Sequence, residues 1–368
     1  MDLTVGQGSF AQADHIKHQQ KEIKRPAVFS DKSVHITKSE CFISRAAKAV
    51  AHGANVAVKA LVSLLSRMIS VVLSPVIWLV ENRLGIAKLL GRRLLPSQSR
   101  EAVDATALVN SKQKTGGNRF EVMDVVDGST RLKAIICYPP GWDKSQDSIS
   151  RCAIFNNGND MCVDDSFDKN GDLDKRSLPG YLQHECQCPV VLYDYNGAGI
   201  NKSSSSPMAT KATIERDGLA VLKHVQSKFD KVIEAGTSLG GGVATTSLEK
   251  LLSTHKDVRV DRFQLINHDS FTTTARVAMP GYPRLADALG GLLGINLNAK
   301  HSIKKLAGQD VSMMVLNNQN DYCIPQGARM SEFAKELKSK QCCTIEDPHG
   351  TGHCHLTERF QQALRAKN

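Results

Sequence analysis

From Phe120 to the C-terminus, short apolar runs alternate with longer segments in which apolar residues recur at helical spacing. The short runs are rich in β-branched and aliphatic residues and predict buried strands, among them RCAIF, PVVLY, KVIEA, RFQLI, VSMMVL and CCTIED. Apolar residues three and four positions apart predict helices over 210–229, 241–252 and 328–337, and in HLTERFQQALRA near the C-terminus. Strands that alternate with helices indicate an α/β protein whose mainly parallel sheet is covered by helices on both faces.

Two further signals complete this pattern. Asp127-Gly128 separates two runs of alternating polar and apolar residues, which predicts a β-hairpin near the start of the domain. The last strand is expected to end at Asp347, so that PHGTGHCHL forms a loop.

We assign residues 119–368 to one α/β domain with a short cap insertion near 271–304, where LADALGGLLGINL lies between two predicted strands. The alternative for this insertion is an extra helix packed on the sheet.

The first hundred residues follow a different pattern. Residues 1–40 are rich in Gln, Lys, His and Ser without sustained periodicity, which predicts a disordered polar N-terminus. Residues 41–95 form a basic apolar region that we expect to be helical, and its 60–80 stretch is apolar apart from serines, one Arg and one Pro. This stretch only just reaches the roughly 20 apolar residues that a spanning helix needs. Residues 96–118 are predicted to be a polar linker.

Basic residues flank and interrupt the apolar segment 56–95, and Glu81 is the only acidic residue between Arg45 and Arg93. Basic residues interleaved with Leu, Ile, Val and Trp are typical of a helical hairpin or an in-plane helix on an anionic membrane. We therefore expect residues 56–95 to bind an anionic membrane surface. The alternative is a helical pair that packs on the α/β domain or forms a subunit contact.

The net charge of +10 lies almost entirely in this N-terminal extension. Residues 1–100 contain 15 Lys and Arg against 6 Asp and Glu, so the rest of the chain is nearly neutral. Because a nucleic-acid enzyme usually spreads positive charge around its site, no nucleic-acid partner is expected. The ten cysteines are scattered without a disulfide framework, which indicates a reducing compartment. The N-terminus also lacks the pattern of a secretory signal peptide.

Polar residues follow several of the predicted strands, at the point where each strand ends. In mainly parallel sheets, ligands bind beyond the carboxyl ends of the strands. The residues at these ends are therefore candidates for a functional site: Asn157, Asn159, Asp194, Ser238, Asp269 and Asp321.

The segment GTSLGGG fits the pattern G-x-S-x-G directly after a predicted buried strand, with Ser238 at its centre. A serine hydroxyl becomes a nucleophile only with a base in reach, an acid that orients the base, and donors for the developing oxyanion. In such a strand-to-helix turn, small residues at Gly236 and Gly240 let the helix pass close to the strand. The alternative is a glycine-rich turn that binds a phosphate or only packs tightly.

The order of the following residues favours the nucleophile. The fold that uses this turn places serine, acid and histidine in that order along the chain. Asp321 follows a predicted strand and His353 lies in the predicted last loop, where His349 and His355 compete with it. Asp269 is a reserve candidate for the acid because it also ends a strand.

With these motifs in order, the chain from Phe120 to Ala366 resembles the α/β-hydrolase-fold serine hydrolases, especially the branch with membrane-associated lipases and protein depalmitoylases. It resembles most an uncharacterised hydrolase family known from chlamydiae and other intracellular bacteria. Two departures are Asn157, where this family usually has His, and Asn318, where it usually has Gly. The matching segments are FNNGN at 155–159, DYNGAGINKS at 194–203, GTSLGG at 236–241, NQNDYCIP at 318–325 and GTGHCHL at 350–356.

This resemblance implies a role for each matching residue. Ser238 is expected to attack the substrate, His353 to transfer the proton, and Asp321 to hold the imidazole of His353. The backbone amides of Leu239 and Asn159 are expected to form the oxyanion hole.

Neither a metal ion nor a cofactor is expected. Structural zinc sites usually have paired ligands at recurring spacings, which the last loop lacks at His349, His353, Cys354 and His355. The only partners for them that stand out in the sequence are His184, Cys186 and Cys188. The segment DKNGDLD at 168–174 has oxygen ligands at the first places of a calcium loop, but it lacks the required Gly and Glu.

Together these patterns predict a membrane-associated serine hydrolase that cleaves an ester or thioester with an acyl chain through an acyl-enzyme. The alternative is a non-catalytic module of the same fold that binds a membrane or a protein. The polar N-terminus, the membrane-seeking segment and the family resemblance also predict export of the protein into a host cell as a bacterial effector.

Overall fold

The structure is a computed structural model. It describes residues 101–115, 119–142, 151–203, 209–292, 294–337 and 339–367. The predicted disordered N-terminus and the predicted membrane-binding segment 56–95 lie outside the described residues.

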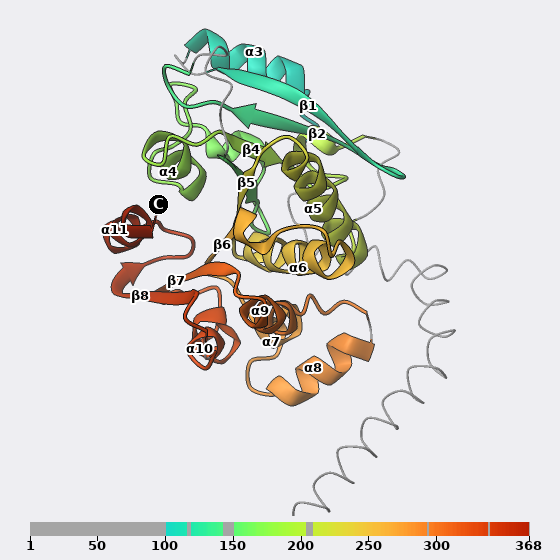
Figure 1. Ribbon diagram of the computed structural model, residues 1–368, viewed down its shortest axis with the longest axis vertical. Helices are drawn as coiled ribbons and strands as arrows, with labels where there is room; N and C mark the ends of the chain where they lie inside the picture. The colour runs from blue at the N-terminus through green and yellow to red at the C-terminus, as the bar shows by residue number, and fades with distance from the viewer. Residues whose placement is uncertain are drawn as a thin grey trace, which may run out of the picture. The chain divides into compact units, whose positions relative to one another are not determined.

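In the described part of the chain, eight strands form one sheet in the order β1-β2-β4-β3-β5-β6-β7-β8 (Figure 1). The hairpin β1–β2 and the pair β2–β4 are antiparallel, and all other neighbours are parallel. The predicted hairpin and the mainly parallel sheet are thus confirmed. The strands are β1 (Phe120–Asp127), β2 (Thr130–Cys137), β3 (Arg151–Asn156), β4 (Val190–Tyr193), β5 (Lys231–Thr237), β6 (Phe263–His268), β7 (Ser312–Asn320) and β8 (Cys342–Thr351).

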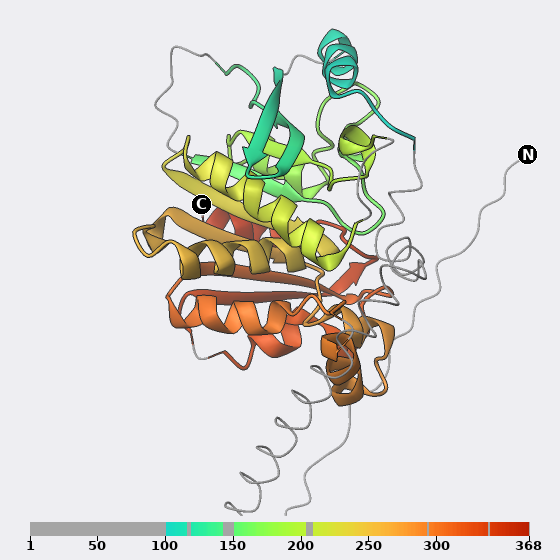
Figure 2. The same ribbon diagram turned by 90° about the vertical axis from the view of Figure 1, so that its right-hand side faces the viewer.

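Helices cover both faces of this sheet, as the alternation of strands and helices predicts. Neighbouring strand residues point to opposite sides, so Ile154 belongs to one buried cluster and Phe155 to the other. Each fully buried side chain of this size contributes about 1.5–3 kcal/mol to folding. One face, which Figure 2 turns toward the viewer, packs against α5 (Lys211–Gln226), α6 (Leu239–Thr254), α9 (Ala299–Gly308) and α10 (Met330–Ala334). The other packs against α3 (Ala105–Thr115), α4 (Leu178–His184) and α11 (Glu358–Lys367).

Three elements differ from the sequence-based expectation. Helix α3 lies in the segment 96–118, which is predicted to be a polar linker. The sequence does not reveal this helix because, of its described side chains, only the narrow stripe of Ala105, Leu108 and Val109 enters the core. Strand β8 continues past Asp347 to Thr351, because its polar end pairs with the polar end of β7 across an irregular register. Helix α10 is shorter than the predicted helix 328–337.

The predicted cap segment 271–304 contains two helices and the start of a third, and their surroundings differ. Helices α7 (Thr274–Ala278) and α8 (Pro283–Leu292) contact each other, and Arg276 on α7 forms an ion pair with Asp287 on α8 at 2.6 Å. Helix α9 instead packs on α6 as part of the layer that covers the sheet. The segment is therefore a cap candidate only over α7 and α8.

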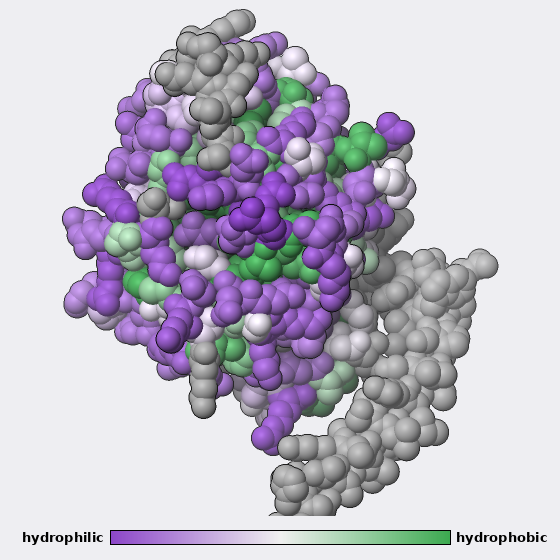
Figure 3. Space-filling view, viewed as in Figure 1, coloured by the Kyte–Doolittle hydropathy of each residue, from purple (hydrophilic) through white to green (hydrophobic). Residues whose placement is uncertain are grey.

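Most of the described surface in Figure 3 is hydrophilic. Three of the exposed large apolar side chains lie on or next to α8: Tyr282, Leu285 and Leu289. Among the described residues, no helix combines the length and the hydrophobicity that spanning a bilayer requires.

Asp217 on α5 is a buried carboxylate away from the candidate site. One of its oxygens, Oδ2, accepts the backbone N–H of Asn196 at 2.8 Å, while Oδ1 is buried without a hydrogen-bond partner. Burial raises the pKa of Asp217 from 3.8 to about 6, against the opposing effects of the Asn196 hydrogen bond and the charge of Arg216. The ionised carboxylate is therefore unfavourable in the folded protein.

This raised pKa predicts a pH-dependent effect of Asp217→Asn on stability. Between pH 3.8 and about 6 the folded wild type binds more protons at this group than the unfolded chain does, so its free energy of unfolding falls as pH rises through this window. Because Asn does not titrate, the stability of the variant relative to wild type should rise by about 2 kcal/mol from pH 4 to pH 7. Urea unfolding of both proteins across this range measures the difference. A difference that does not change with pH contradicts the prediction.

Candidate active site

Ser238 occupies the tight turn between β5 and α6. Its backbone has φ 53° and ψ −120°, a left-handed conformation that residues other than glycine rarely adopt. The turn is held by hydrogen bonds from Ser238 N to His268 O (2.9 Å) and from Ser270 Oγ to Ser238 O (2.7 Å). The serine thus stands at the N-terminus of α6, where the helix dipole favours negative charge.

The glycines around Ser238 are required by close backbone contacts. A Cβ atom on Gly236 would lie 2.3 Å from the backbone of Gly240, and one on Gly240 would lie 1.9 Å from the carbonyl oxygen of Asn156. Because backbone atoms cannot yield to such contacts, only glycine lets α6 start this close to β5 and β3. The structure therefore accounts for the two outer glycines of the G-x-S-x-G pattern.

His353 and Asp321 form a hydrogen-bonded pair. Asp321 is the first residue after β7, and its Oδ2 lies 3.0 Å from Nδ1 of His353, which follows β8 by two residues. Oδ1 of Asp321 accepts the backbone N–H groups of Cys323 (2.7 Å) and Ile324 (3.2 Å). Burial raises the pKa of Asp321, but the hydrogen bond and charge of His353 and the two amides outweigh it, so this pKa lies below its ordinary value. The ionised carboxylate favours a proton on Nδ1 and leaves Nε2 free to accept one.

A cavity of about 580 Å³ joins the candidate residues. Ser238 and His353 line it together with Leu239 and Asn159, the two residues whose amides are predicted oxyanion donors, while Asp321 is not part of its lining. The rest of the wall is mainly apolar and includes Met161, Phe271, Val277 and Ile324, with Tyr322 at 81% exposure. The sequence did not identify these apolar residues as part of a site; their only signal is that Phe271, Tyr322 and Ile324 lie within four residues of a strand end.

The loop after β3 is fixed next to Ser238. A Cβ atom on Gly158 would lie 3.7 Å from Cβ of Ser238, so the chain that carries Asn159 passes beside the serine. Asn157, at the position where the resembled family has His, donates from Nδ2 to the carbonyl oxygen of Tyr193 (3.0 Å) and to Oδ1 of Asp194 (3.1 Å). The side chain of Asn157 therefore anchors the loop to the end of β4.

Asp194 is the centre of this anchor. Besides Asn157, its carboxylate accepts the backbone N–H groups of Val163 and Ile200, each at 2.9 Å. Burial raises the pKa of Asp194 to about 6, and the hydrogen bonds from Ile200, Val163 and Asn157 oppose this shift. Asp194, predicted as a candidate site residue by its place at a strand end, thus stabilises the loop after β3 by hydrogen bonds.

The structure separates the three histidines of the last segment. Only His353 lines the cavity and pairs with an acid among them. His349 lies within β8, and its backbone N–H donates to Asp347. His355 is exposed, and its carbonyl oxygen accepts a hydrogen bond from Asn318.

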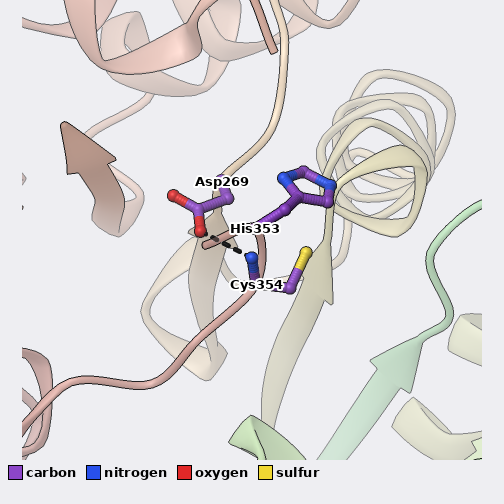
Figure 4. A group of neighbouring side chains, drawn as sticks. All are labelled: Asp269, His353 and Cys354. Atoms are coloured by element: carbon purple, nitrogen blue, oxygen red, sulfur yellow. Dashed lines mark hydrogen bonds between the residues drawn. The ribbon is translucent and has the colours of Figure 1, made fainter. Parts of the chain in front are cut away.

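Asp269, the reserve acid, is fully buried after β6 and is not the partner of His353 Nδ1, which is Asp321. Its Oδ2 lies 3.4 Å from Nε2 of the buried His268. Its Oδ2 instead accepts the backbone N–H of Cys354 at 2.8 Å (Figure 4). Its two oxygens also accept the backbone and side-chain N–H groups of Asn318. Asp269 therefore contacts the backbone of the turn that carries His353.

Two thiols also face this region. Burial, followed by the charge of Asp269, raises the pKa of Cys354 well above its ordinary value, and burial, followed by the charge of Asp321, raises the pKa of Cys323. Since the thiolate is the reactive form of cysteine, neither residue is activated as a nucleophile. Ser238 is the better candidate.

Two groups of side chains could offer metal ligands. The ligand atoms of Asp269, His353 and Cys354, and those of Asp321, Cys323 and His353, lie within 4.8 Å of one another. The carboxylate oxygens in both groups already accept hydrogen bonds. The segment 168–174, which lacks the Gly and Glu of a calcium loop, folds on itself, with Asp168 Oδ1 accepting the N–H groups of Asn170 and Asp172. The carboxylates of Asp168, Asp269 and Asp321 thus have hydrogen-bond partners within the protein.

No known family model and no curated sequence matches the chain. Among solved structures, the chain is similar to an alpha-beta hydrolase from Vibrio vulnificus, with 12% identity and a TM-score of 0.53 over 77% of this chain and 92% of that one. An esterase from Pyrococcus furiosus (12% identity, TM-score 0.46, 73% and 93% covered) and one from Pyrobaculum calidifontis (14%, 0.44, 72% and 88%) are also similar. The Vibrio structure and the strand order show that the chain has the α/β-hydrolase fold.

The contact between Gly240 and β3 predicts that Gly240→Ala is strongly destabilising. The new methyl group would meet the carbonyl oxygen of Asn156, and relieving such overpacking should cost about 3 kcal/mol of unfolding free energy. The control is Gly291→Ala in α8, where no atom lies within 4 Å of the added Cβ and a gain of up to about 1 kcal/mol is expected from helix propensity. Urea unfolding measures both, and equal effects would contradict the account of the turn.

Proposed function

We propose that the protein is a serine hydrolase that cleaves an ester or thioester through Ser238, His353 and Asp321. The observation that carries this proposal is the hydrogen bond between His353 Nδ1 and Asp321 Oδ2 beside the cavity that Ser238 also lines. The left-handed backbone of Ser238 adds support, because serine nucleophiles of this fold sit on such strained turns. Chain order and geometry thus point to the same three residues.

In the proposed reaction, Ser238 Oγ attacks the substrate carbonyl carbon and passes its proton to Nε2 of His353. The ionised Asp321 keeps the imidazole oriented and stabilises the imidazolium that forms. The backbone N–H groups of Leu239 and Asn159 bind the oxyanion, and one such donor is typically worth about 10²–10³-fold in rate. The imidazolium then protonates the leaving alcohol or thiol. Water, deprotonated by His353, releases the acid from the acyl-enzyme.

The shape and lining of the cavity support an acyl substrate. A volume of about 580 Å³ lies within the usual range of ligand pockets, about 300–1,000 Å³. Met161, Phe271, Val277 and Ile324 present apolar surface beside Ser238, which suits a hydrocarbon chain better than a polar acyl group. Helix α7, one of the two helices of the cap candidate, supplies Val277 to the wall of the cavity.

The reaction test uses a fluorophosphonate probe, which reacts with activated serine nucleophiles. Wild type should be labelled, Ser238→Ala should not, and Ser247→Ala, a change on the buried part of α6, should keep the label. His353→Ala should abolish labelling and ester turnover, because general-base catalysis contributes about 10²–10⁴-fold. His355→Ala should retain most of both, since its side chain is exposed. Equal labelling of Ser238→Ala and Ser247→Ala, or a larger loss in His355→Ala, contradicts the proposal.

The non-catalytic alternative rests on the unusual oxyanion loop, where Asn157 stands in place of the usual His, and on the large N-terminal extension. In the structure, Asn157 anchors the oxyanion loop and Asn318 contacts the turn of His353, so both have partners around the site rather than blocking it. These contacts support the catalytic proposal. A wild-type protein without any Ser238-dependent labelling would favour the alternative.

We further propose that residues 56–95 hold the enzyme at an anionic membrane, on the evidence of their sequence alone. The full-length protein should float with vesicles that contain anionic lipid and not with neutral vesicles, and Arg92→Glu with Arg93→Glu should weaken flotation. Equal binding to both vesicle types contradicts this. Export into a host cell stays a prediction of the N-terminal sequence, and a reporter fused to that segment that is not exported would remove it.

A further inference from the structure

The backbone after β6 contacts the candidate nucleophile. The carbonyl oxygen of His268, the last residue of β6, accepts the N–H of Ser238 at 2.9 Å. Two residues later, Ser270 Oγ donates to the carbonyl oxygen of Ser238 at 2.7 Å. Asp269 lies between these two contacts and is itself held by a hydrogen bond from its N–H to Leu316 O on β7.

The carboxylate of Asp269 contacts the segments that carry Asp321 and His353. Oδ1 accepts the N–H of Asn318 at 2.7 Å, and Oδ2 accepts Asn318 Nδ2 at 2.6 Å and the N–H of Cys354 at 2.8 Å. Asn318 Nδ2 also donates to the carbonyl oxygen of His355 at 3.0 Å. The pair, which we call the Asp269–Asn318 clamp, therefore holds one backbone group of each of the two residues that follow His353: the N–H of Cys354 and the carbonyl oxygen of His355.

The turn that carries His353 needs such support. Gly352 has φ 90° and Cys354 has φ 61°, so the histidine lies between two residues in the left-handed region. Cys354 is not glycine, and neither is Asp269 with φ 44°; residues in this region persist where the surrounding structure holds them. The hydrogen bond from Cys354 N to Asp269 Oδ2 joins these two strained residues directly (Figure 4).

Neighbouring residues are shaped to fit the clamp. Gly350 has no side chain where a Cβ would lie 2.0 Å from Asn318 Oδ1. Both members of the clamp are fully buried, and neither lines the cavity of about 580 Å³. Their contacts are therefore with the protein rather than with a substrate.

We propose that Asp269 and Asn318 are positioning residues that set the place of His353 relative to Ser238 and Asp321. This inference rests on the proposed function. The carboxylate of Asp269 acts through the backbone of Cys354, while Asp321 is the hydrogen-bond partner of the imidazole. The asparagine that departs from the family pattern at position 318 thus supplies the second contact of the clamp, to His355.

The clamp should affect the chemical step rather than substrate binding. His353 must accept the proton of Ser238 while its Nδ1 stays on Asp321, and a displacement of about 1 Å in a catalytic group can lower the rate by about 100-fold. Asp269→Asn keeps the size of the side chain but replaces one acceptor oxygen with an NH₂ group. That group would face an N–H donor of Asn318 or Cys354, and one hydrogen bond of the clamp would be lost.

The experiment measures the rate constant and the final extent of fluorophosphonate labelling for full-length wild type, Asp269→Asn, Asn318→Ala and Asp217→Asn. Asp217 is the matched control, since it is a fully buried carboxylate that also accepts a backbone N–H but lies away from the cavity. We expect the labelling rate constant to fall by roughly 100-fold in Asp269→Asn and by a smaller factor in Asn318→Ala. The final labelled fraction should stay near that of wild type, and KM for an acyl ester should change less than about twofold while kcat falls, because uniform binding is untouched.

The outcomes separate positioning from a loss of folding. A smaller final labelled fraction with a rate constant like that of wild type means that part of the protein is unfolded, and this result in both clamp variants overturns the proposal. Labelling of Asp269→Asn within twofold of the wild-type rate, or an equal decrease in Asp217→Asn, also overturns it while the proposed function stands. A wild type that shows no Ser238-dependent labelling overturns the proposed function and the clamp with it.

Discussion

The hydrogen bond between His353 Nδ1 and Asp321 Oδ2 is the interaction on which the candidate site depends. It joins two segments that are 32 residues apart and leave the sheet at neighbouring strands, β7 and β8. Since the two strands are parallel, their carboxyl ends meet at one edge of the sheet, and a short extension from each suffices to bring acid and base together. His353 and, to a smaller extent, the amides of Cys323 and Ile324 favour the ionised carboxylate. The two amides also fix its position, so the imidazole receives a defined orientation.

Backbone strain is concentrated around this pair. Of the five described non-glycine residues with positive φ, three are Ser238, Asp269 and Cys354, at the ends of β5 and β6 and in the turn after β8. A left-handed conformation costs roughly 1–2 kcal/mol of folding free energy per non-glycine residue. A hydrogen bond to a charged group contributes about 1.5–3 kcal/mol, which is enough to offset that cost. Strands, helices and a buried carboxylate thus hold three buried or half-buried turns in conformations that the isolated chain would avoid.

The sequence alone allowed the fold and the identity of the catalytic candidates to be predicted, because both depend on local pattern and chain order. The spacing of glycines around Ser238 is a local requirement of one turn, and Asp321 and His353 follow it in the order that the fold demands. The contacts of Asn157 and Asn318 could not be predicted, because their partners, Asp194 and Asp269, are distant in the chain.

The differences in the fold have a similar origin. Only three residues of α3 enter the core, too few to produce a strong apolar period in a polar segment. The sequence of the polar end of β8 predicts a loop because many of its side chains lie outside the core, although this end pairs with β7. The cavity wall formed by α7 depends on how the segment after β6 folds back, which local spacing does not specify.

The most direct measurement is the mass of the covalent intermediate. The protein is mixed with a medium-chain 4-nitrophenyl ester, quenched in acid and digested, and the acylated peptide is located by mass spectrometry. The account predicts an acyl group on Ser238 in wild type and no acylated peptide in Ser238→Ala. An acyl group on Cys323 or Cys354, or ester turnover that continues in Ser238→Ala, would contradict it.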